Sequence, residues 1–262
     1  MENQNILHTE NLSIGYVSKK KQNVIASNIN LSFGKAKLIS LVGANGIGKS
    51  TLLRTITRIQ TPISGKILIN EKNISDYSPI EMAQQLSVVL TEKLPPSNLT
   101  VFELVALGRQ PYTNWIGTMS EHDIFKINNA LELSQIQHLS NKKHYELSDG
   151  QLQKVLVARA FAQDTPLIIL DEPTTHLDLL NKVSLFKLLK KMSVESEKCI
   201  LFSTHDIDLA IQLSDEMVVM TPGKTYQDTP ENLITNGNFD KLFNDENIAF
   251  DASKSKFVFK NF

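Results

Sequence analysis

The feature that most constrains the fold of this 262-residue sequence is a glycine-rich segment at residues 43–50, referred to below as the glycine loop. It reads Gly-Ala-Asn-Gly-Ile-Gly-Lys-Ser and matches the pattern G-x-x-x-x-G-K-[S/T] at every required position. Residues 37–42 before it form an apolar segment typical of a strand. Residues 50–59 after it carry apolar side chains at helical spacing and stop before Pro62. A strand that passes through such a loop into a helix favours an α/β fold.

The glycine loop has the chemistry to bind a polyphosphate. Glycine tolerates positive φ, so the backbone can wrap closely around an anion with its N–H groups turned inward. The positive end of the following helix points at the same place. We expect Lys49 to contact the β- and γ-phosphates and Ser50 to ligate Mg²⁺; the alternative is an ordinary glycine turn beside a surface lysine. The residues predicted to bind nucleotide here are Gly43, Ala44, Asn45, Gly46, Ile47, Gly48, Lys49, Ser50 and Thr51.

Apolar segments alternate with helical ones along the chain, which predicts a mainly parallel α/β sheet. Strands are expected at residues 12–14, 24–33, 37–42, 65–70, 87–90, 167–170 and 199–203, and helices at 50–59, 79–86, 101–107, 121–134 and 152–162, with a helical turn at 136–139. Residues 91–145 differ in character and read as a helical insertion. The last segment, residues 250–262, offers Phe257-Val258-Phe259 as a closing strand.

Two apolar strands end in polar residues that suit hydrolysis. Residues 167–170 lead into Asp171-Glu172-Pro173, and residues 199–202 lead into Ser203-Thr204-His205. The carboxyl ends of parallel strands are where α/β folds bind ligands. We expect Asp171 to hold Mg²⁺, Glu172 to act as the general base for an attacking water, and His205 to orient Glu172. The alternatives are a solvated acidic turn and a structural histidine.

Composition narrows the class of protein. The formal net charge of −1 gives no indication of the basic face that nucleic-acid binders usually carry, so no nucleic-acid partner is expected. The single cysteine, Cys199, cannot form an internal disulfide and is expected to be a buried strand thiol. No apolar stretch approaches the roughly 20 residues that span a bilayer. Any work at a membrane is therefore expected to go through a partner.

The segment Leu147-Ser148-Asp149-Gly150-Gln151, referred to below as the signature segment, precedes a helix and lies shortly before the Asp171 strand. By itself it predicts only a capped helix start, with Ser148 as the N-cap and Gln151 completing a capping box. Together with the preceding motifs, it resembles the signature of the nucleotide-binding subunits of ABC transporters, and the resemblance covers residues 6–243.

The resemblance implies a P-loop NTPase fold of the α/β class. It would have a mainly parallel sheet core, an N-terminal antiparallel β subdomain, and an inserted helical subdomain at about residues 91–150 within a domain of residues 6–243. Residues 244–262 would form a C-terminal tail to which it assigns no role. The helical subdomain would carry the signature segment and dock against a transmembrane partner.

The resemblance also implies a composite site for ATP and Mg²⁺. Ser148, Gly150 and Gln151 would close on the ATP held by a second copy of the chain, with Asp178 in a loop between the two copies. Tyr16 would stack on adenine, although a half-buried strand tyrosine is the alternative. The metal-binding residues would be Ser50, Asp171 and Thr91, and the catalytic ones Glu172 and His205.

The sequence departs from the family pattern at two positions. Thr91 stands where a glutamine usually begins the helical insertion, which puts the coupling role there in doubt. Asp149 replaces the first glycine of the signature and adds a negative charge, so we predict that its side chain points away from the nucleotide.

The implied activity is ATP hydrolysis that powers a transporter from the cytoplasmic face of the inner membrane. Residues 104–112 and 171–178 resemble the branch that imports iron–siderophore chelates, haem and cobalamin. The implied partners are a second copy, transmembrane permease subunits and, indirectly, a substrate-binding protein. Two alternatives keep the glycine loop: an ABC-type ATPase in a soluble assembly scaffold, and a small-molecule kinase, which would have no use for the signature segment.

Overall fold

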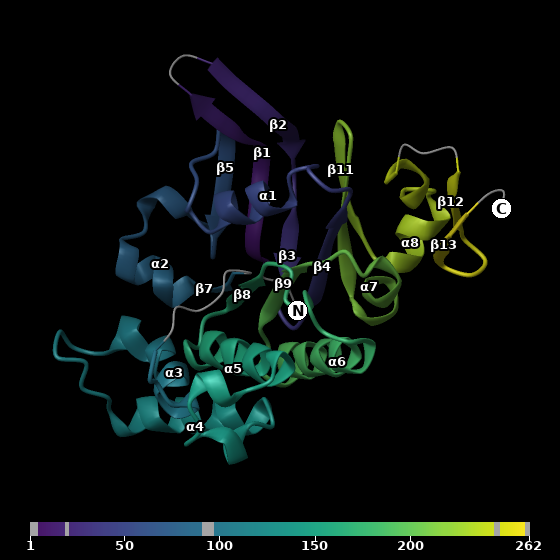
Figure 1. The fold of residues 1–262 in the computed structure, drawn as a ribbon. Helices are drawn as coiled ribbons and strands as arrows, with labels where there is room; N and C mark the ends of the chain where they lie inside the picture. The colour runs from purple at the N-terminus through teal and green to yellow at the C-terminus, as the bar shows by residue number, and fades with distance from the viewer. Residues whose placement is uncertain (1–4, 19–20, 91–96, 244–246, 260–262) are drawn as a thin grey trace.

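A six-stranded sheet forms the centre of the molecule in the computed structural model, which describes residues 5–18, 21–90, 97–243 and 247–259 (Figure 1). Its strand order is β11-β10-β4-β9-β8-β7, parallel except for the edge strand β11. The strands are β4 (Leu38–Gly43), β7 (Leu86–Val89), β8 (Leu167–Leu170), β9 (Cys199–Ser203), β10 (Glu216–Thr221) and β11 (Lys224–Asp228). Every residue of β4, β8 and β9 is buried, as expected for parallel strands covered on both faces. The predicted parallel core and the buried Cys199 are confirmed.

A second, antiparallel sheet is built from the N-terminal part of the chain, as predicted. It contains β1 (Asn5–Ser18), β2 (Lys21–Ile29), β3 (Ser32–Gly34), β5 (Ser64–Ile69) and β6 (Lys72–Asn73). The prediction of a single strand at residues 24–33 is wrong, because strand pairing is interrupted between the end of β2 at Ile29 and the start of β3 at Ser32. There the buried Thr9 hydroxyl donates to Ile29 O and accepts from Leu31 N, both at 2.9 Å. The Thr9 side chain thus bridges the interruption, next to a backbone bond from Thr9 N to Leu31 O at 2.9 Å.

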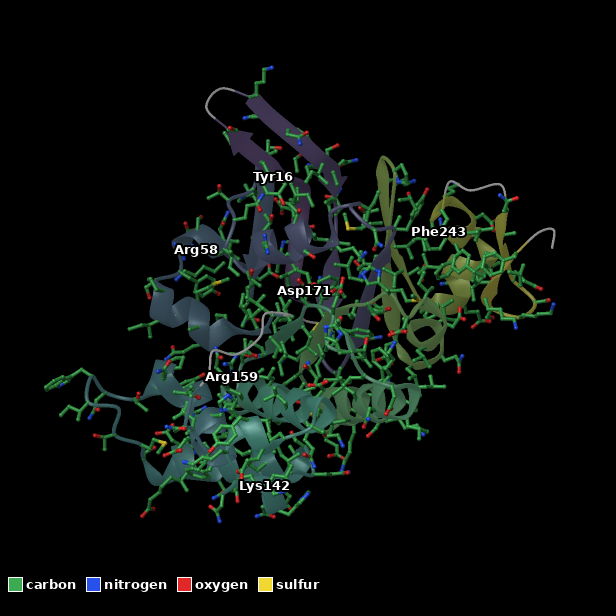
Figure 2. The ribbon with its side chains drawn as sticks, viewed as in Figure 1. Tyr16, Arg58, Lys142, Arg159, Asp171 and Phe243 are labelled. Carbon is green, nitrogen blue, oxygen red and sulfur yellow. The ribbon has the colours of Figure 1, made fainter. Side chains whose placement is uncertain are left out.

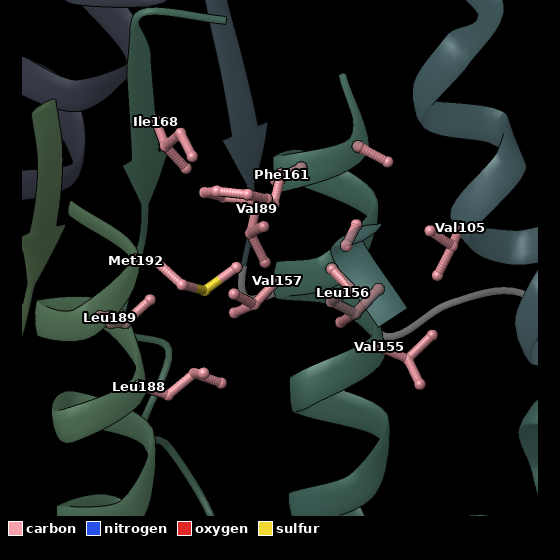
Figure 3. Close-up of a cluster of buried hydrophobic side chains, with 14 of the residues drawn as sticks. Val89, Val105, Val155, Leu156, Val157, Phe161, Ile168, Leu188, Leu189 and Met192 are labelled. Atoms are coloured by element: carbon pink, nitrogen blue, oxygen red, sulfur yellow. The ribbon is translucent and has the colours of Figure 1, made fainter. Parts of the chain in front are cut away.

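Helices cover both faces of the central sheet. On the face shared with the antiparallel sheet lies α1 (Lys49–Ile56), and on the other face lie α5 (Asp149–Ala162) and α6 (Leu179–Glu195). Figure 3 shows the hydrophobic core on the face covered by α5 and α6. There Val89 and Ile168 from the sheet lie near Val157 and Phe161 of α5 and Met192 of α6. Three shorter helices are α2 (Pro79–Gln85), α7 (Ile207–Leu213) and α8 (Pro230–Thr235), with 3₁₀ turns η1 (Ile74–Asp76) and η5 (Phe239–Lys241).

A helical layer packs beneath α5. Its elements are α3 (Val101–Ala106), η2 (Leu107–Tyr112), α4 (Glu121–Leu133), η3 (Gln137–Leu139) and η4 (His144–Glu146). The helix predicted at 101–107 tightens into 3₁₀ turns at Leu107, and the turn predicted at 136–139 is also 3₁₀. The chain comes so close to α5 there that a Cβ on Gly108 would lie 2.3 Å from Arg159 O.

A buried ion pair holds this layer together. Arg109 Nε donates to Asp123 Oδ1 at 2.9 Å, with both side chains at most 6% exposed, and the same guanidinium donates to Ala162 O at the end of α5. Burial alone would raise the pKa of Asp123. Hydrogen bonds from Ser120 and the charge of Arg109 outweigh burial and hold that pKa below its ordinary value. One cation therefore ties η2, α4 and α5 together.

The C-terminal segment forms its own hairpin of β12 (Ile248–Asp251) and β13 (Lys256–Phe259). Residues 257–259 form a strand, as expected, but within the described residues β13 pairs with β12 alone and joins neither larger sheet. Aromatic contacts fix the hairpin instead: Phe250 stacks on Phe239 at 4.8 Å between ring centroids, and Phe257 meets Phe243 edge-on at 4.9 Å. Among the residues described, no helix is both long and apolar enough to cross a bilayer.

Candidate active site

The glycine loop connects the fully buried strand β4 to helix α1. Gly48 is the N-cap of α1 and adopts φ +113°, where a Cβ would also lie 2.7 Å from Ile25 Cγ2. Gly46 adopts φ +77°. Both positions need glycine, because side-chain-bearing residues rarely adopt such angles. Among the described residues no side chain caps α1, and its first turn holds no acidic residue. Its N–H groups are therefore available to an anion.

Lys49 lies inside the loop rather than on the surface, with 6% of the residue exposed. Its Nζ donates to Gly43 O at 2.8 Å and to Ala44 O at 3.3 Å. Burial lowers the pKa of Lys49, and the negative charges of Glu172 and Asp171 partly oppose that effect. The loop lysine and the acidic pair are thus close enough to feel one another's charge, although they are more than 120 residues apart in the chain.

The acidic pair follows β8, as predicted, and lies near the centre of the molecule, where Figure 2 labels Asp171. Ser203, at the end of the neighbouring strand β9, links the two acids. Its hydroxyl donates to Asp171 Oδ1 at 2.6 Å and accepts from Glu172 N at 2.8 Å. Glu172 has φ +47°, an angle that is uncommon for a residue with a side chain and is often found at functional sites.

His205 contacts the second acid of the pair. Its Nε2 lies 2.6 Å from Glu172 Oε1, and the two side chains are 48% and 25% exposed. The other Glu172 oxygen accepts from Thr175 Oγ1 at 3.4 Å. A series of hydrogen bonds therefore runs from Asp171 through Ser203 and Glu172 to His205. Its outer end, at His205, is open to solvent, and the two carboxylates of the series act electrostatically on Lys49.

Sequence reasoning missed two members of this network. Ser203 was seen only as the end of a strand, and Asp206 was given no role. Asp206 accepts from Thr174 Oγ1 at 3.0 Å and from Lys182 Nζ at 2.8 Å, so it anchors the loop after the acidic pair. The signal that could have revealed Ser203 is a lone hydroxyl at the end of an otherwise apolar strand, Cys-Ile-Leu-Phe-Ser.

Tyr16 lies on β1, on the side of the molecule that carries α1 (Figure 2). It is 48% exposed, and its hydroxyl shares a hydrogen bond of 3.2 Å with Thr51 Oγ1 in α1. Its ring therefore presents a face to solvent within reach of the helix that follows the glycine loop. Thr91, the third predicted metal ligand, lies outside the described residues.

The signature segment forms the capped helix start that its sequence predicts. Gln151 N donates to Ser148 Oγ at 3.3 Å, and Ser148 N donates to Gln151 Oε1 at 3.1 Å. Gly150 lies against Asn181, whose N–H donates to Asp178 Oδ1 at 2.8 Å. The structure thus brings Ser148, Gly150, Gln151 and Asp178 together. Among the described residues, no hydrogen bond or ion pair joins this group to the glycine loop of the same copy.

The donor set near the glycine loop fits a hard divalent cation. Ser50 at the start of α1 and Asp171 after β8 supply oxygen atoms, and Asp171 is already oriented by Ser203. Within the described residues, no group of three or more His, Cys, Asp or Glu side chains could hold a metal ion. Mg²⁺ does not require such a group, because it is commonly held by one or two carboxylates together with substrate phosphates.

Comparison with known proteins agrees with this geometry. The family model described as ABC transporter matches residues 26–175. The iron(3+)-hydroxamate import ATP-binding protein FhuC of Bacillus subtilis is 37% identical over 219 residues, which cover 84% of this chain and 80% of the relative.

Two solved structures of ABC transporter proteins have a fold similar to that of this chain. One shows a transporter assigned to the metal-chelate ABC type in an inward-facing conformation; it is 28% identical, with a TM-score of 0.78, and covers 97% of this chain and 95% of its own. The other is the dimeric structure of a bacterial ABC transporter cassette, 27% identical with a TM-score of 0.72, covering 86% and 98%.

Proposed function

This chain belongs to the ATP-binding subunits of ABC transporters and is an ATPase, and from that premise we propose that it energises import of an iron chelate, haem or cobalamin. Two likenesses support this cargo class. The Bacillus subtilis relative is named for iron(3+)-hydroxamate import, and the structural neighbour is of the metal-chelate type. Residues 104–112 and 171–178, which resemble that importer branch, point the same way.

The observation that carries the proposed chemistry is the hydrogen-bond series Asp171–Ser203–Glu172–His205 beside Lys49. In the proposed mechanism Glu172 takes the proton from the water that attacks the γ-phosphate, and His205 holds its carboxylate in place. A positioned base of this kind contributes about 10²–10⁴ in rate. Lys49 exchanges its bonds to Gly43 O and Ala44 O for oxygens of the β- and γ-phosphates.

Ser50 and Asp171 are proposed to hold Mg²⁺, with Thr91 a further candidate from the sequence. Bound Mg²⁺ would neutralise charge on the phosphates. The role of this chain is to present the two oxygen donors from different elements, the start of α1 and the end of β8. The Ser203 hydrogen bond fixes one oxygen of Asp171. The Asp171 side chain therefore has less conformational entropy to lose when Mg²⁺ binds. Tyr16 is proposed to stack on the adenine through its exposed face.

We infer that a second copy of the chain completes each site. Ser148, Gly150, Gln151 and Asp178 lie together, and among the described residues none of them bonds to the glycine loop of its own copy. This supports a role at the nucleotide held by a partner copy. The dimeric cassette that this chain resembles supports such pairing. Bound γ-phosphate would then supply contacts that exist only in the closed dimer, and hydrolysis would release them.

Affinity purification from detergent-solubilised membranes tests the transport role. We expect a polytopic permease to copurify with the tagged chain, which would place the chain at the cytoplasmic face of the membrane as a peripheral subunit. Recovery of a soluble assembly complex instead would contradict the transport role and favour the scaffold alternative. Phosphate release from ATP without any phosphorylated product would dismiss the kinase alternative.

A further inference from the structure

A hollow of about 410 Å³ opens between α5, α6 and the end of α4, away from the hydrogen-bond series described above. Three cations line it: Lys154 of α5, and Lys187 and Lys191 of α6. None of the nine lining residues is a carboxylate. The apolar part of the wall comes from Leu180, Val183 and Leu188. We refer to this site as the lysine hollow.

The lysines on the two faces of α6 differ in their ion pairs. On one face Lys182 pairs with Asp206 and Lys190 pairs with Asp215, so both charges are neutralised by acids outside the helix. On the hollow face Lys187 has no ion pair among the described residues. Lys191 has only Glu195 at 3.8 Å, and both of these side chains are 49% exposed. Lys187 and Lys191 are one turn apart, a like-charge arrangement that destabilises a helix by itself.

The local helix ends do not cancel this charge. The C-terminal end of α4 reaches the hollow at Ser134, and a helix end carries only about −0.5 of an elementary charge. Even with Glu195 set against Lys191, the charges of Lys154 and Lys187 exceed that fraction and leave a positive site. Ser134 is fully buried in the wall, and within the described residues its hydroxyl has no hydrogen-bond partner. The hollow therefore carries excess positive charge.

We propose that the lysine hollow binds a small phosphorylated molecule that carries two or three negative charges. Ammonium groups act as point charges that suit phosphate, and the volume lies within the range of small-molecule sites, about 300–1,000 Å³. The phosphates lie against Lys154, Lys187 and Lys191, and the organic part lies against Leu180 and Val183. A ligand there bridges α5 and α6, the helices that begin next to Ser148 and Asp178.

Calorimetric titration with inorganic pyrophosphate tests the charge requirement. The background is Lys49→Ala, which weakens binding at the glycine loop. We expect saturable binding that Lys187→Met weakens about tenfold, the effect of losing one close charge contact. The matched control is Lys190→Met, which removes the same charge from the paired face of α6 and is expected to change affinity less than about twofold. Phenyl phosphate should bind more tightly than inorganic phosphate because it adds contact with the apolar wall.

Three results would overturn the proposal: no saturable binding at about 10 mM pyrophosphate, equal weakening by Lys187→Met and Lys190→Met, or an equally tight, Lys187-dependent interaction with an oligoglutamate peptide. The last result would mark the hollow as a site for an acidic protein segment.

Since Lys49→Ala could itself disturb the fold, the titration is repeated on the unaltered protein by NMR of the lysine ammonium groups. There the signals of Lys154, Lys187 and Lys191 should shift while that of Lys190 stays in place.

Discussion

Helices α1 and α5 both begin at a glycine-containing motif, yet their N-terminal ends are prepared in opposite ways. The end of α1 follows Gly48 and has neither a capping side chain nor an acid in its first turn within the described residues. The end of α5 is closed by the reciprocal bonds of Ser148 and Gln151 and carries Asp149 in its first turn. The first leaves its N–H groups to an anion, whereas the second satisfies part of its own.

This difference teaches how one chain can hold two unequal halves of a site. The α1 end follows the buried strand β4, and Lys49 there feels the charges of Glu172 and Asp171. In the proposed site it binds phosphate without help from another copy. The α5 end is exposed and already stable by itself. In the proposed dimer, this suits a contact with a partner's nucleotide that forms and breaks in each cycle.

The largest effect is expected at the base. Glu172→Gln keeps the hydrogen-bonding shape but cannot accept a proton, so the rate of ATP hydrolysis should fall by about 10²–10⁴ while ATP still binds. Light scattering should detect dimers that accumulate with ATP. If the variant hydrolysed ATP at the unaltered rate, the assignment of Glu172 as the base would be wrong.

The next largest effect is expected on ATP affinity, at Lys49, the first residue of α1. Lys49→Ala removes charge-assisted hydrogen bonds worth about 1.5–3 kcal/mol, so ATP affinity should fall roughly 10- to 150-fold. Equilibrium binding of a fluorescent ATP analogue measures this loss. Normal affinity would show that the loop does not hold phosphate as described, and Lys190→Met serves as the control for net charge.

A smaller effect is expected at the cap of α5. Ser148→Ala removes the N-cap bond and should lower the free energy of unfolding by about 1 kcal/mol, whereas Ser148→Gly should cost only a few tenths. Urea unfolding measures this stability, and ATP-driven dimerisation measures the contact with a partner. If Ser148 only caps its helix, the glycine variant would dimerise as the native chain does; we expect it to dimerise poorly.

The smallest effect is expected at Asp149. Asp149→Asn removes a charge that favours the positive end of α5, so stability should fall by about 0.3–1 kcal/mol. Because the side chain is predicted to point away from the nucleotide, the dimerisation constant with ATP should change less than about twofold. Dimerisation strengthened tenfold by the same substitution would show that Asp149 faces the partner's phosphates and restrains closure.

Local patterns account for what the sequence could predict. The glycine loop, the apolar strands β4 and β8 and the capping box at Ser148 are each encoded within a few neighbouring residues, and the structure forms all of them. Ser203 could not be given its role, because its bonds to Asp171 and Glu172 join residues 32 and 31 positions apart. The insertion of Thr9 between β2 and β3 likewise depends on contacts made 20 residues away. Such links exist only once the strands are side by side.

The hairpin of β12 and β13 has a consequence for anyone who shortens or tags the chain. Phe250 and Phe257 pack on a cluster that includes Phe239 and, from α7, Ile207 and Ala210. Helix α7 begins two residues after His205, so the aromatic contacts of the hairpin brace the helix that follows this side chain. Cleavage near residue 247 would therefore remove packing that supports α7 and so the position of His205. Lost ATP hydrolysis in a truncated sample would not mean that the removed residues take part in the reaction.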